Sequence, residues 1–325
     1  MLKVGLIGCG GIGAVHAKCW IYMNEKTELA AVADANTEKA ESIAKICGAA
    51  VYSDAEEMLK NEKLDVVDIC LPTALHTRFA TLAMKYVKNV IIEKPICLTE
   101  EDARLLLATE KETGACVQVA HIVRFGTAHD YLKQVFDSKE YGEIKTGTFI
   151  RISPKPVWVN GYNDVTRTGG MQLDLQIHNL DFIRYLMGGD PENVGTVIQR
   201  GNDGVIEHLF AHYRYGDALF TDECSWEYPT SMPFKAGYRV RFEGATLVSE
   251  GEDVTVYPED GEAFKPKLEE RAVMDLGINV SNFGDFLKEL GSFADAINEG
   301  RTEVSLKDAI AAFRLSKLQL EKELL

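Results

Sequence analysis

Short apolar runs alternate with amphipathic stretches over the first third of the chain. The amphipathic stretches, of which Thr99–Thr113 is the longest, have the spacing of helices with one buried face. Strands alternating with helices in this way are typical of a parallel sheet covered by helices on both faces. The apolar runs predict buried strands at Val4–Ile7, Leu29–Ala33, Val66–Leu71, Val90–Ile92 and Val117–Val119.

The pattern changes after Arg124. Apolar and polar residues alternate along longer runs, which favours a largely antiparallel sheet with one face packed on helices. We therefore expect an α/β protein with a parallel-sheet domain at 1–122 and an α+β domain with a large open sheet at 123–325. The later elements are predicted as a helix around Tyr131–Phe136, strands at Thr146–Ile152, Val205–Tyr213 and Ala218–Trp226, and closing helices near Phe283–Asn298 and Leu306–Leu324.

A glycine-rich turn follows the first predicted strand. Gly8 allows the tight turn, Gly10 lets the backbone approach a pyrophosphate, and Gly13 lets the next helix pack closely on the strand. Asp34 ends the second strand, at about the 20-residue spacing expected of the acid that binds a ribose diol. A carboxylate there repels the extra phosphate of NADP, so the pattern favours NAD. An isolated Asp before Asn36 would otherwise be interpreted as a turn residue.

Composition narrows the class of protein. The chain has 325 residues, of which 46% are hydrophobic, enough to form the cores of two domains. Its formal net charge of −15 disfavours nucleic acid and anionic membrane surfaces as partners, because both require clustered Lys and Arg. We expect a small-molecule substrate.

The seven cysteines are scattered, with no CxxC pair. This spacing predicts neither a disulfide framework nor a zinc site, and no other group of His, Cys and carboxylates has the spacing of metal ligands. The first strand begins almost at the first residue and no apolar run reaches transmembrane length. We therefore expect a cytoplasmic protein with buried free thiols and no metal ion.

Four features, taken together, resemble the Gfo/Idh/MocA family of oxidoreductases over essentially the whole chain. They are Gly8-x-Gly10-x-x-Gly13, Glu93-Lys94-Pro95, Gly169-Gly170 followed by Asp174-x-x-x-His178, and the helical segment 293–297. The resemblance implies an N-terminal dinucleotide-binding domain of Rossmann type at 1–122 and a C-terminal substrate domain at 123–325. It also implies hydride transfer to or from a sugar or polyol carbon, and a sheet through which subunits form a homodimer or homotetramer.

The resemblance makes Lys94, Asp174 and His178 the candidate catalytic residues. Lys94 directly follows a buried strand, where an ammonium group can stabilise an alkoxide, although most lysines are merely surface residues. Asp174 and His178 share one face if Leu173–Leu186 is a helix. His178 then suits the task of general base and Asp174 that of positioning a hydroxyl. Outside this family context, such residues are more often a helix cap and a core histidine.

Further contacts are expected where strands end, because ligands gather at the carboxyl ends of parallel strands. Arg124 is equally well explained as an anchor of the domain junction. Expected substrate contacts are His121, Arg124, Trp158, Asp174 and His178. Expected cofactor contacts are Gly8, Gly10, Gly11, Ile12, Gly13, Asp34, Leu71, Pro72, Thr73, His76, Glu93 and Lys94.

The sequence therefore predicts an NAD-dependent dehydrogenase acting on the CH–OH group of a sugar, an inositol-like polyol or a sugar derivative. Two alternatives stay open. Some relatives in the family are glycosidases that use NAD without net redox change, through a transient keto-sugar. The family is also similar to a dinucleotide-sensing regulator without turnover, which the presence of Lys94, Asp174 and His178 disfavours.

Overall fold

The computed structural model describes residues 1–156, 164–277 and 282–323, and the chain divides into two compact units. Unit 1 comprises Met1–Ile122 and Arg271–Ile310, and unit 2 comprises Val123–Glu270 and Ala311–Leu325. The first boundary lies where the sequence pattern changes. Residues 271–310, however, belong to unit 1, whereas the sequence pattern had assigned everything from 123 onward to the second domain.

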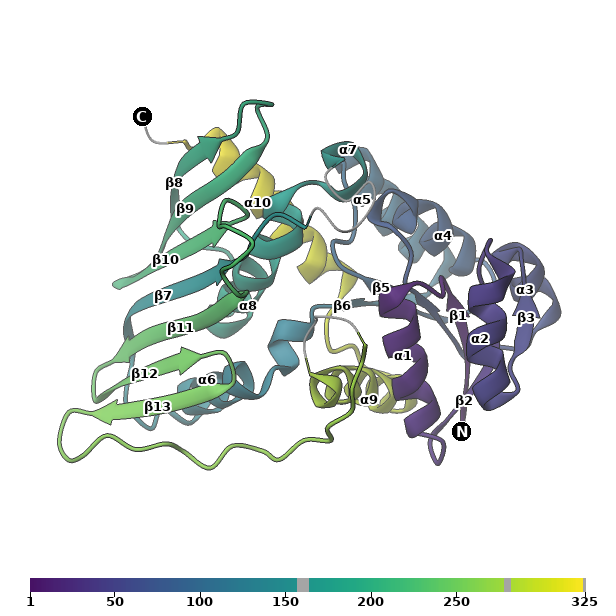
Figure 1. The fold of residues 1–325 in the computed structure, drawn as a ribbon, viewed down its shortest axis with the longest axis horizontal. Helices are drawn as coiled ribbons and strands as arrows, with labels where there is room; N and C mark the ends of the chain where they lie inside the picture. Colours follow the sequence, from purple (N-terminus) through teal and green to yellow (C-terminus); the bar gives the residue numbers. More distant parts are fainter. Residues whose placement is uncertain (157–163, 278–281, 324–325) are drawn as a thin grey trace. The chain divides into compact units, whose positions relative to one another are not determined.

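Unit 1 contains a parallel six-stranded sheet with the order β3-β2-β1-β4-β5-β6 (Figure 1). The order reverses between β1 and β4, and such a switch point is where open α/β sheets bind ligands. The strands are β1 (Leu2–Ile7), β2 (Thr27–Ala33), β3 (Ala50–Tyr52), β4 (Val66–Ile69), β5 (Asn89–Glu93) and β6 (Cys116–Ala120).

Helices connect these strands, and caps fix where several of them begin and end. Thr99, for example, accepts a hydrogen bond from the Asp102 N–H at the start of α5, and Gly114 ends the same helix in the left-handed conformation. The helices in this part of unit 1 are α1 (Gly11–Tyr22), α2 (Thr37–Cys47), α3 (Ala55–Asn61), η1 (Thr73–Leu75), α4 (His76–Ala83) and α5 (Glu100–Thr113).

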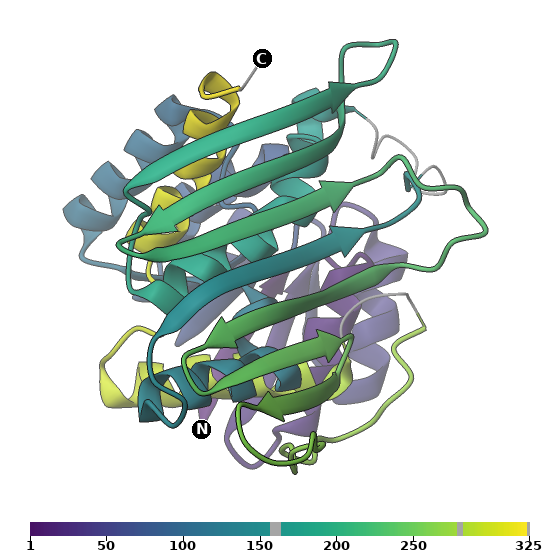
Figure 2. The same ribbon diagram turned by 90° about the vertical axis from the view of Figure 1, so that its left-hand side faces the viewer.

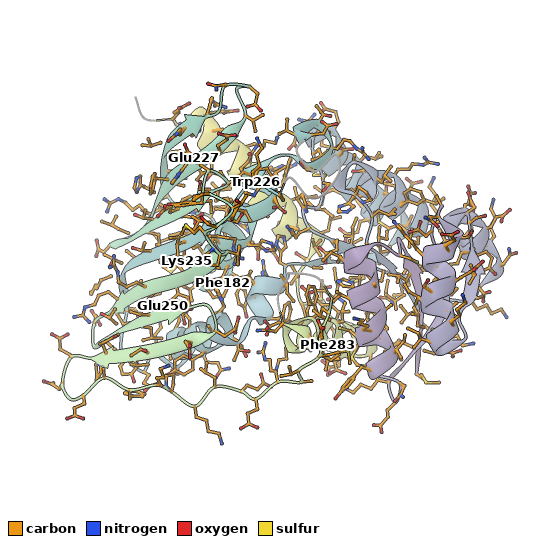
Figure 3. The ribbon with its side chains drawn as sticks, in the orientation of Figure 1. Phe182, Trp226, Glu227, Lys235, Glu250 and Phe283 are labelled. Carbon is orange, nitrogen blue, oxygen red and sulfur yellow. The ribbon has the colours of Figure 1, made fainter. Side chains whose placement is uncertain are left out.

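Helix α9 (Phe283–Glu299) explains why residues 271–310 belong to unit 1. It packs beside α1, and Phe283, labelled in Figure 3, meets Tyr22 edge to face with ring centroids 5.4 Å apart. Its apolar face is buried, including Phe286 and Phe293. The amphipathic pattern predicts this helix but does not say which apolar partner covers it.

Unit 2 contains a seven-stranded sheet with the order β13-β12-β11-β7-β10-β9-β8, in which only β7 and β10 pair in parallel (Figure 2). The mostly antiparallel sheet that the alternation predicts is therefore confirmed. Its strands are β7 (Ile144–Ile152), β8 (Asn193–Arg200), β9 (Ile206–Tyr215), β10 (Ala218–Ser225), β11 (Lys235–Phe242), β12 (Ala245–Glu250) and β13 (Asp253–Pro258).

Helices of unit 2 cover one face of this sheet and leave the other open (Figure 2). On the covered face Phe182, labelled in Figure 3, lies 6.0 Å from Phe149 of β7 between ring centroids, in a fully buried aromatic core. The remaining helices are η2 (Ile122–Phe125), α6 (Thr127–Ser138), α7 (Val165–Thr168), the π-helical η3 (Gln172–Gln176), α8 (Ile177–Met187) and α10 (Leu306–Glu321), which runs from unit 1 into unit 2.

Two local features differ from the expected elements. The short strand β3, Ala50–Tyr52, gives no detectable period because it has only three residues. The single helix expected at Leu173–Leu186 begins as the π-helical turn η3 and becomes α-helical at Ile177. A π-turn differs from an α-turn in its hydrogen-bond partner and not in residue type, so hydrophobic spacing does not reveal it.

All seven cysteines are free thiols. Among the residues that the structure describes, no helix combines the length and the apolar character needed to cross a membrane.

Candidate active site

The glycine turn between β1 and α1 has the shape of a phosphate-binding loop. A Cβ on Gly8, where φ is +95°, would lie 2.5 Å from the Cys70 carbonyl oxygen, and one on Gly13 would lie 1.9 Å from the Gly8 carbonyl oxygen. Both positions therefore require glycine. A Cβ on Gly10, by contrast, would meet no atom within 4 Å, so the turn is open there.

The start of α1 fits a pyrophosphate. Gly10 is its N-cap, and the first turn of the helix contains no acidic residue that would repel an anion. The first backbone N–H groups of a helix have no partner within the helix, and the helix dipole places partial positive charge at this end. The open space at Gly10 and these N–H groups together fit the diphosphate of a dinucleotide.

Asp34 is fixed beside this turn. One carboxylate oxygen accepts the Cys9 N–H at 2.7 Å, and the other accepts the Asn36 N–H at 2.8 Å. The second bond is the turn contact that the alternative interpretation expected, so Asp34 shapes the turn and also keeps its half-buried carboxylate next to the glycines. Burial and the Asp34 charge raise the pKa of the Cys9 thiol to about 12, so this thiol is neutral.

Two loops at the carboxyl edge of the sheet are joined by His76. Its ring is fully buried, with Nδ1 2.8 Å from the Pro95 carbonyl oxygen and Nε2 2.7 Å from the Leu71 carbonyl oxygen. Burial lowers its pKa, against the raising effect of the two carbonyl hydrogen bonds. These contacts give His76 a structural task and leave Leu71, Pro72 and Thr73, all partly or fully exposed, as the accessible residues of this loop.

Glu93 and Lys94 lie at the end of β5. Lys94 is partly exposed, and its backbone N–H donates to Glu93 Oε2 at 3.0 Å. Glu93 Oε1 lies 3.1 Å from His16 Nε2. The peptide bond between Lys94 and Pro95 is cis, a point that the sequence left open.

In unit 2, Asp174 lies in η3 and His178 in the first turn of α8. Gly169 and Gly170, with φ of +83° and +78°, turn the chain into this segment. Between residues 171 and 184, only Gln172, Asp174 and His178 are not buried. Apart from Gln172, Asp174 and His178 are therefore the accessible residues of a buried segment. The segment begins with a π-helical turn, and such turns are frequent at functional sites.

A buried polar network lies under this segment. Asn179 Nδ2 donates to Asp222 Oδ1 at 2.8 Å, and Arg151 Nε donates to Asn179 Oδ1 at 3.2 Å. Burial raises the pKa of Asp222 to about 6, against the lowering effect of its hydrogen bonds. Burial also lowers the pKa of Arg151, while Cys224, Asp222 and Asp174 raise it. The network ties the start of α8 to the sheet.

The other predicted substrate contacts are placed less favourably. The Arg124 guanidinium is buried and binds Asp181 of the same unit at 2.7 Å and 2.6 Å, a contact within unit 2 and not at the domain junction. His121 follows β6 and is only 2% exposed. Buried side chains of this kind favour structural roles over substrate contact. Trp158 lies outside the described residues.

The sequence reasoning missed His16, Asp68 and Glu289, which are fully buried in unit 1. Asp68 had a usable signal, because a carboxylate inside the apolar run of β4 must find partners. Contrary to the expectation from linear spacing, three metal-binding side-chain types do meet here: the ligand atoms of His16, Asp68 and Cys70 lie within 4.8 Å of one another. Hydrogen bonds within the cluster already account for their positions.

The sheet order, the glycine turn at the switch point and the acid ending β2 define a dinucleotide-binding protein of Rossmann type. A family model described as "Oxidoreductase family, NAD-binding Rossmann fold" matches residues 2–121, and the "GFO/IDH/MocA C-terminal domain" matches residues 129–248. The chain belongs to the Gfo/Idh/MocA family of oxidoreductases, and its cofactor is NAD.

Several relatives have names that state an activity. The scyllo-inositol 2-dehydrogenase (NAD(+)) of Bacillus subtilis is 26% identical over 93% of this chain and 88% of its own. The inositol 2-dehydrogenase of Rhizobium meliloti is 34% identical, over 59% of this chain and 57% of its own. The D-glucoside 3-dehydrogenase of Escherichia coli is 31% identical, over 58% and 54%. The last two matches span little more than half of either chain.

Solved structures share the whole fold. UDP-N-acetylglucosamine 3-dehydrogenase from Acidithiobacillus ferrooxidans has a TM-score of 0.81 at 21% identity, covering 99% of this chain and 97% of its own. Levoglucosan dehydrogenase, in complex with NADH and levoglucosan, has a TM-score of 0.84 at 20% identity, covering 99% and 96%. At these identities the likeness concerns the fold alone.

Proposed function

We propose that this protein is an NAD-dependent dehydrogenase that oxidises a hydroxyl-bearing carbon of a sugar, an inositol-like polyol or a sugar derivative. The observation that supports it most is the accessibility of Asp174 and His178 on a segment that, apart from Gln172, is buried. The names of the inositol and glucoside dehydrogenases among its relatives support the substrate class.

The proposed roles follow from the chemistry of each side chain. The Lys94 ammonium donates a hydrogen bond to the reacting oxygen and stabilises the negative charge that develops on it. His178 accepts the hydroxyl proton as that O–H bond breaks, and Asp174 accepts a hydrogen bond from a neighbouring hydroxyl to orient the substrate. Bound NAD supplies the hydride acceptor. Oxidation of one substrate molecule thus releases one proton.

The test is NADH formation, followed by its near-ultraviolet absorbance, with NAD and a panel of inositols, aldoses, sugar acids and polyols. Lys94→Ala is expected to lower kcat by about 10²-fold to 10³-fold, the cost of losing one preorganised charge-stabilising donor. Lys88→Ala is the matched control, because Lys88 is an exposed lysine just before the same strand. It should keep wild-type turnover.

Wild-type kcat in Lys94→Ala would contradict the role of the lysine. Turnover of glycosides without accumulation of NADH would overturn the dehydrogenase and support the redox-neutral glycosidase. NAD binding measured by calorimetry, without turnover of any sugar, polyol or glycoside, would instead support a dinucleotide-sensing regulator.

We also propose that the protein is a cytoplasmic homodimer or homotetramer formed through the open face of the unit 2 sheet. Val197 and Phe210 are direct partners across β8 and β9, and are 47% and 37% exposed. Leu219 on β10, 45% exposed, alternates with buried residues and so shares this face. Exposed apolar side chains on one face of a sheet favour a protein interface. The free thiols are consistent with a reducing compartment.

A further inference from the structure

A charged cluster that the proposed function does not use lies inside unit 1. His16 comes from α1, Asp68 from β4, Cys70 from the residue after β4, and Glu93 from the end of β5. His16 and Asp68 are fully buried. Ionisable groups are rarely buried so completely without partners, so the contacts among these four residues decide what the cluster does.

The ring of His16 lies between two carboxylates. Nδ1 is 2.9 Å from Asp68 Oδ2, and the same oxygen accepts the Trp20 indole N–H at 2.7 Å. Nε2 is 3.1 Å from Glu93 Oε1, a close ion-pair contact whose angle departs from that of an aligned hydrogen bond. Both nitrogens of one imidazole therefore face carboxylate oxygens.

This geometry selects the imidazolium form of His16. A neutral ring has one N–H and would point a lone pair at the second carboxylate, whereas the charged ring offers N–H groups to both. Two carboxylates beside a neutral ring would also leave buried negative charge uncompensated. Burial by itself lowers the pKa of His16, but the hydrogen bonds to Cys70 and Asp68 and the Asp68 charge outweigh it and raise the pKa well above its ordinary value.

Helix α9 also faces His16, but it does not supply a negative charge to balance the imidazolium. Helix α9 presents Phe286, whose ring lies 5.7 Å from the imidazole, and Glu289, which is fully buried. Neither carboxyl oxygen of Glu289 has a hydrogen-bond partner among the described residues. Burial, with the charges of Glu93 and Asp68, raises the pKa of Glu289, which makes it a neutral carboxyl group. Asp68 and Glu93 therefore balance the imidazolium.

Glu93 links His16 to Lys94, the candidate catalytic residue. One of its carboxylate oxygens contacts His16, and the other accepts the Lys94 backbone N–H at 3.0 Å. A glutamate at a strand end would otherwise be free to rotate into solvent and would lose rotamer entropy when held. The contact with His16 offsets this loss of entropy. It holds Glu93 Oε1, and Oε2 then points toward the backbone N–H of Lys94.

We propose that His16 is a positioning residue, a permanent imidazolium that holds Glu93 and, through it, the backbone of Lys94. The inference rests on the proposed function only in assigning Lys94 to catalysis. It ties the helix that begins at the pyrophosphate turn to the residue proposed to stabilise the reacting oxygen. A small displacement of Lys94 is enough to slow catalysis, since misplacing a catalytic group by about 1 Å lowers the rate about 10²-fold.

A metal ion at His16, Asp68 and Cys70 is the competing explanation. It requires a deprotonated Nδ1, whereas this atom shares Asp68 Oδ2 with the Trp20 N–H in a hydrogen-bonded arrangement. Burial, with the Asp68 charge, raises the pKa of the Cys70 thiol, while metal binding needs the thiolate. The observed contacts favour hydrogen bonds, and the metal content of the purified protein decides between the two.

The first experiment measures the protonation state of the His16 ring and does not depend on an activity assay. Proton–nitrogen NMR of protein labelled at its histidines should show both His16 ring nitrogens protonated at pH 8, with the resonance assigned by its absence in His16→Gln. In Glu93→Gln the ring loses one counter-charge and should deprotonate at lower pH. A neutral His16 ring at pH 7 overturns the proposal, as does a stoichiometric metal ion that is lost in His16→Gln.

The second experiment reads catalysis. His16→Gln is expected to lower kcat by about 10-fold to 10²-fold, while the Kd for NAD, measured by calorimetry, changes less than about threefold. His129→Gln is the matched control, because His129 is a buried histidine of unit 2 whose pKa burial lowers to about 3 and whose ring contacts are aromatic. Both variants should lose stability, but only His16→Gln should lose kcat per folded molecule.

A double variant separates positioning from general damage. If His16 acts through Glu93, the His16→Gln, Glu93→Gln double variant should lose no more kcat than the worse single variant, because the two losses are one effect. Losses that multiply overturn the proposal, as does wild-type kcat in His16→Gln. If the wild-type protein turns over no substrate, the proposed function fails while the NMR experiment still decides the state of His16.

Discussion

Single side chains at the sheet edge determine the chemistry of the cofactor site. Asp34 is the clearest case, because its two oxygens are held by the N–H groups of Cys9 and Asn36, and we expect its charge to meet the ribose of NAD. Asp34→Ala removes both the ribose acceptor and the charge that repels a 2′-phosphate. Calorimetry should show the Kd for NAD raised by about tenfold, because one charge-assisted hydrogen bond is lost. The Kd for NADP should rise less than this or fall.

Asp54→Ala is the control for this substitution. Asp54 also follows a strand and accepts two backbone N–H groups, from Glu56 at 2.8 Å and Glu57 at 3.0 Å, as the N-cap of α3. Its loss should cost about 1 kcal/mol of stability and leave the ratio of NAD to NADP affinity unchanged. An unchanged ratio in Asp34→Ala as well would sink the assigned role of Asp34.

At the scale of elements, the buried network between α8 and the sheet makes stability depend on pH. The pKa of Asp222 is about 6 in the folded protein and about 3.8 in the unfolded chain, because burial disfavours the charge. As the pH rises from about 4 to about 6, the unfolded chain releases this proton first, so the folded state loses about 3 kcal/mol relative to it. The contribution is favourable at low pH and is absent above the folded pKa.

Asp222→Asn should therefore be more stable than the wild type at pH 7.5 and should lose most of this advantage at pH 4.5. The amide oxygen of the variant can still accept the bond from Asn179. Denaturant unfolding at the two pH values measures the difference, and Asp217→Asn, at the exposed turn before β10, controls for removal of a charge. A difference that does not change with pH would contradict the raised pKa.

Elements also show how far sequence reasoning reaches. The glycines, Asp34 and Glu93-Lys94-Pro95 stand at strand ends that hydrophobic runs predict, so their place at the sheet edge follows from local pattern. The assignments of His121 and Arg124 were weaker, because sequence spacing does not show that Arg124 meets Asp181 or that His121 is buried. Such facts depend on which elements pack together.

At the scale of the whole molecule, the open face of the unit 2 sheet predicts self-association. Phe210→Glu places a charge on this face beside Val197 and opposite Glu223, its partner on β10, and should dissociate the oligomer, because burying an unpaired charge costs several kcal/mol. Ile46→Glu is the matched control, since Ile46 is an apolar residue on α2 with 69% exposure. Light scattering should show a smaller mass for Phe210→Glu only, and a monomeric wild-type protein would refute the interface.

Sequence alone determined the class of this protein. Hydrophobic period, glycine turns and residues at strand ends are local properties, set by sterics and by neighbours within a few positions, and they predicted the two sheets and the dinucleotide turn. The catalytic candidates came from the resemblance to a family, which short motifs carry. Tertiary structure alone decided that α9 packs on α1 and that His16 meets Asp68 and Glu93. These partners come from separate strands and helices, and only the order of strands in the folded sheet brings them into contact.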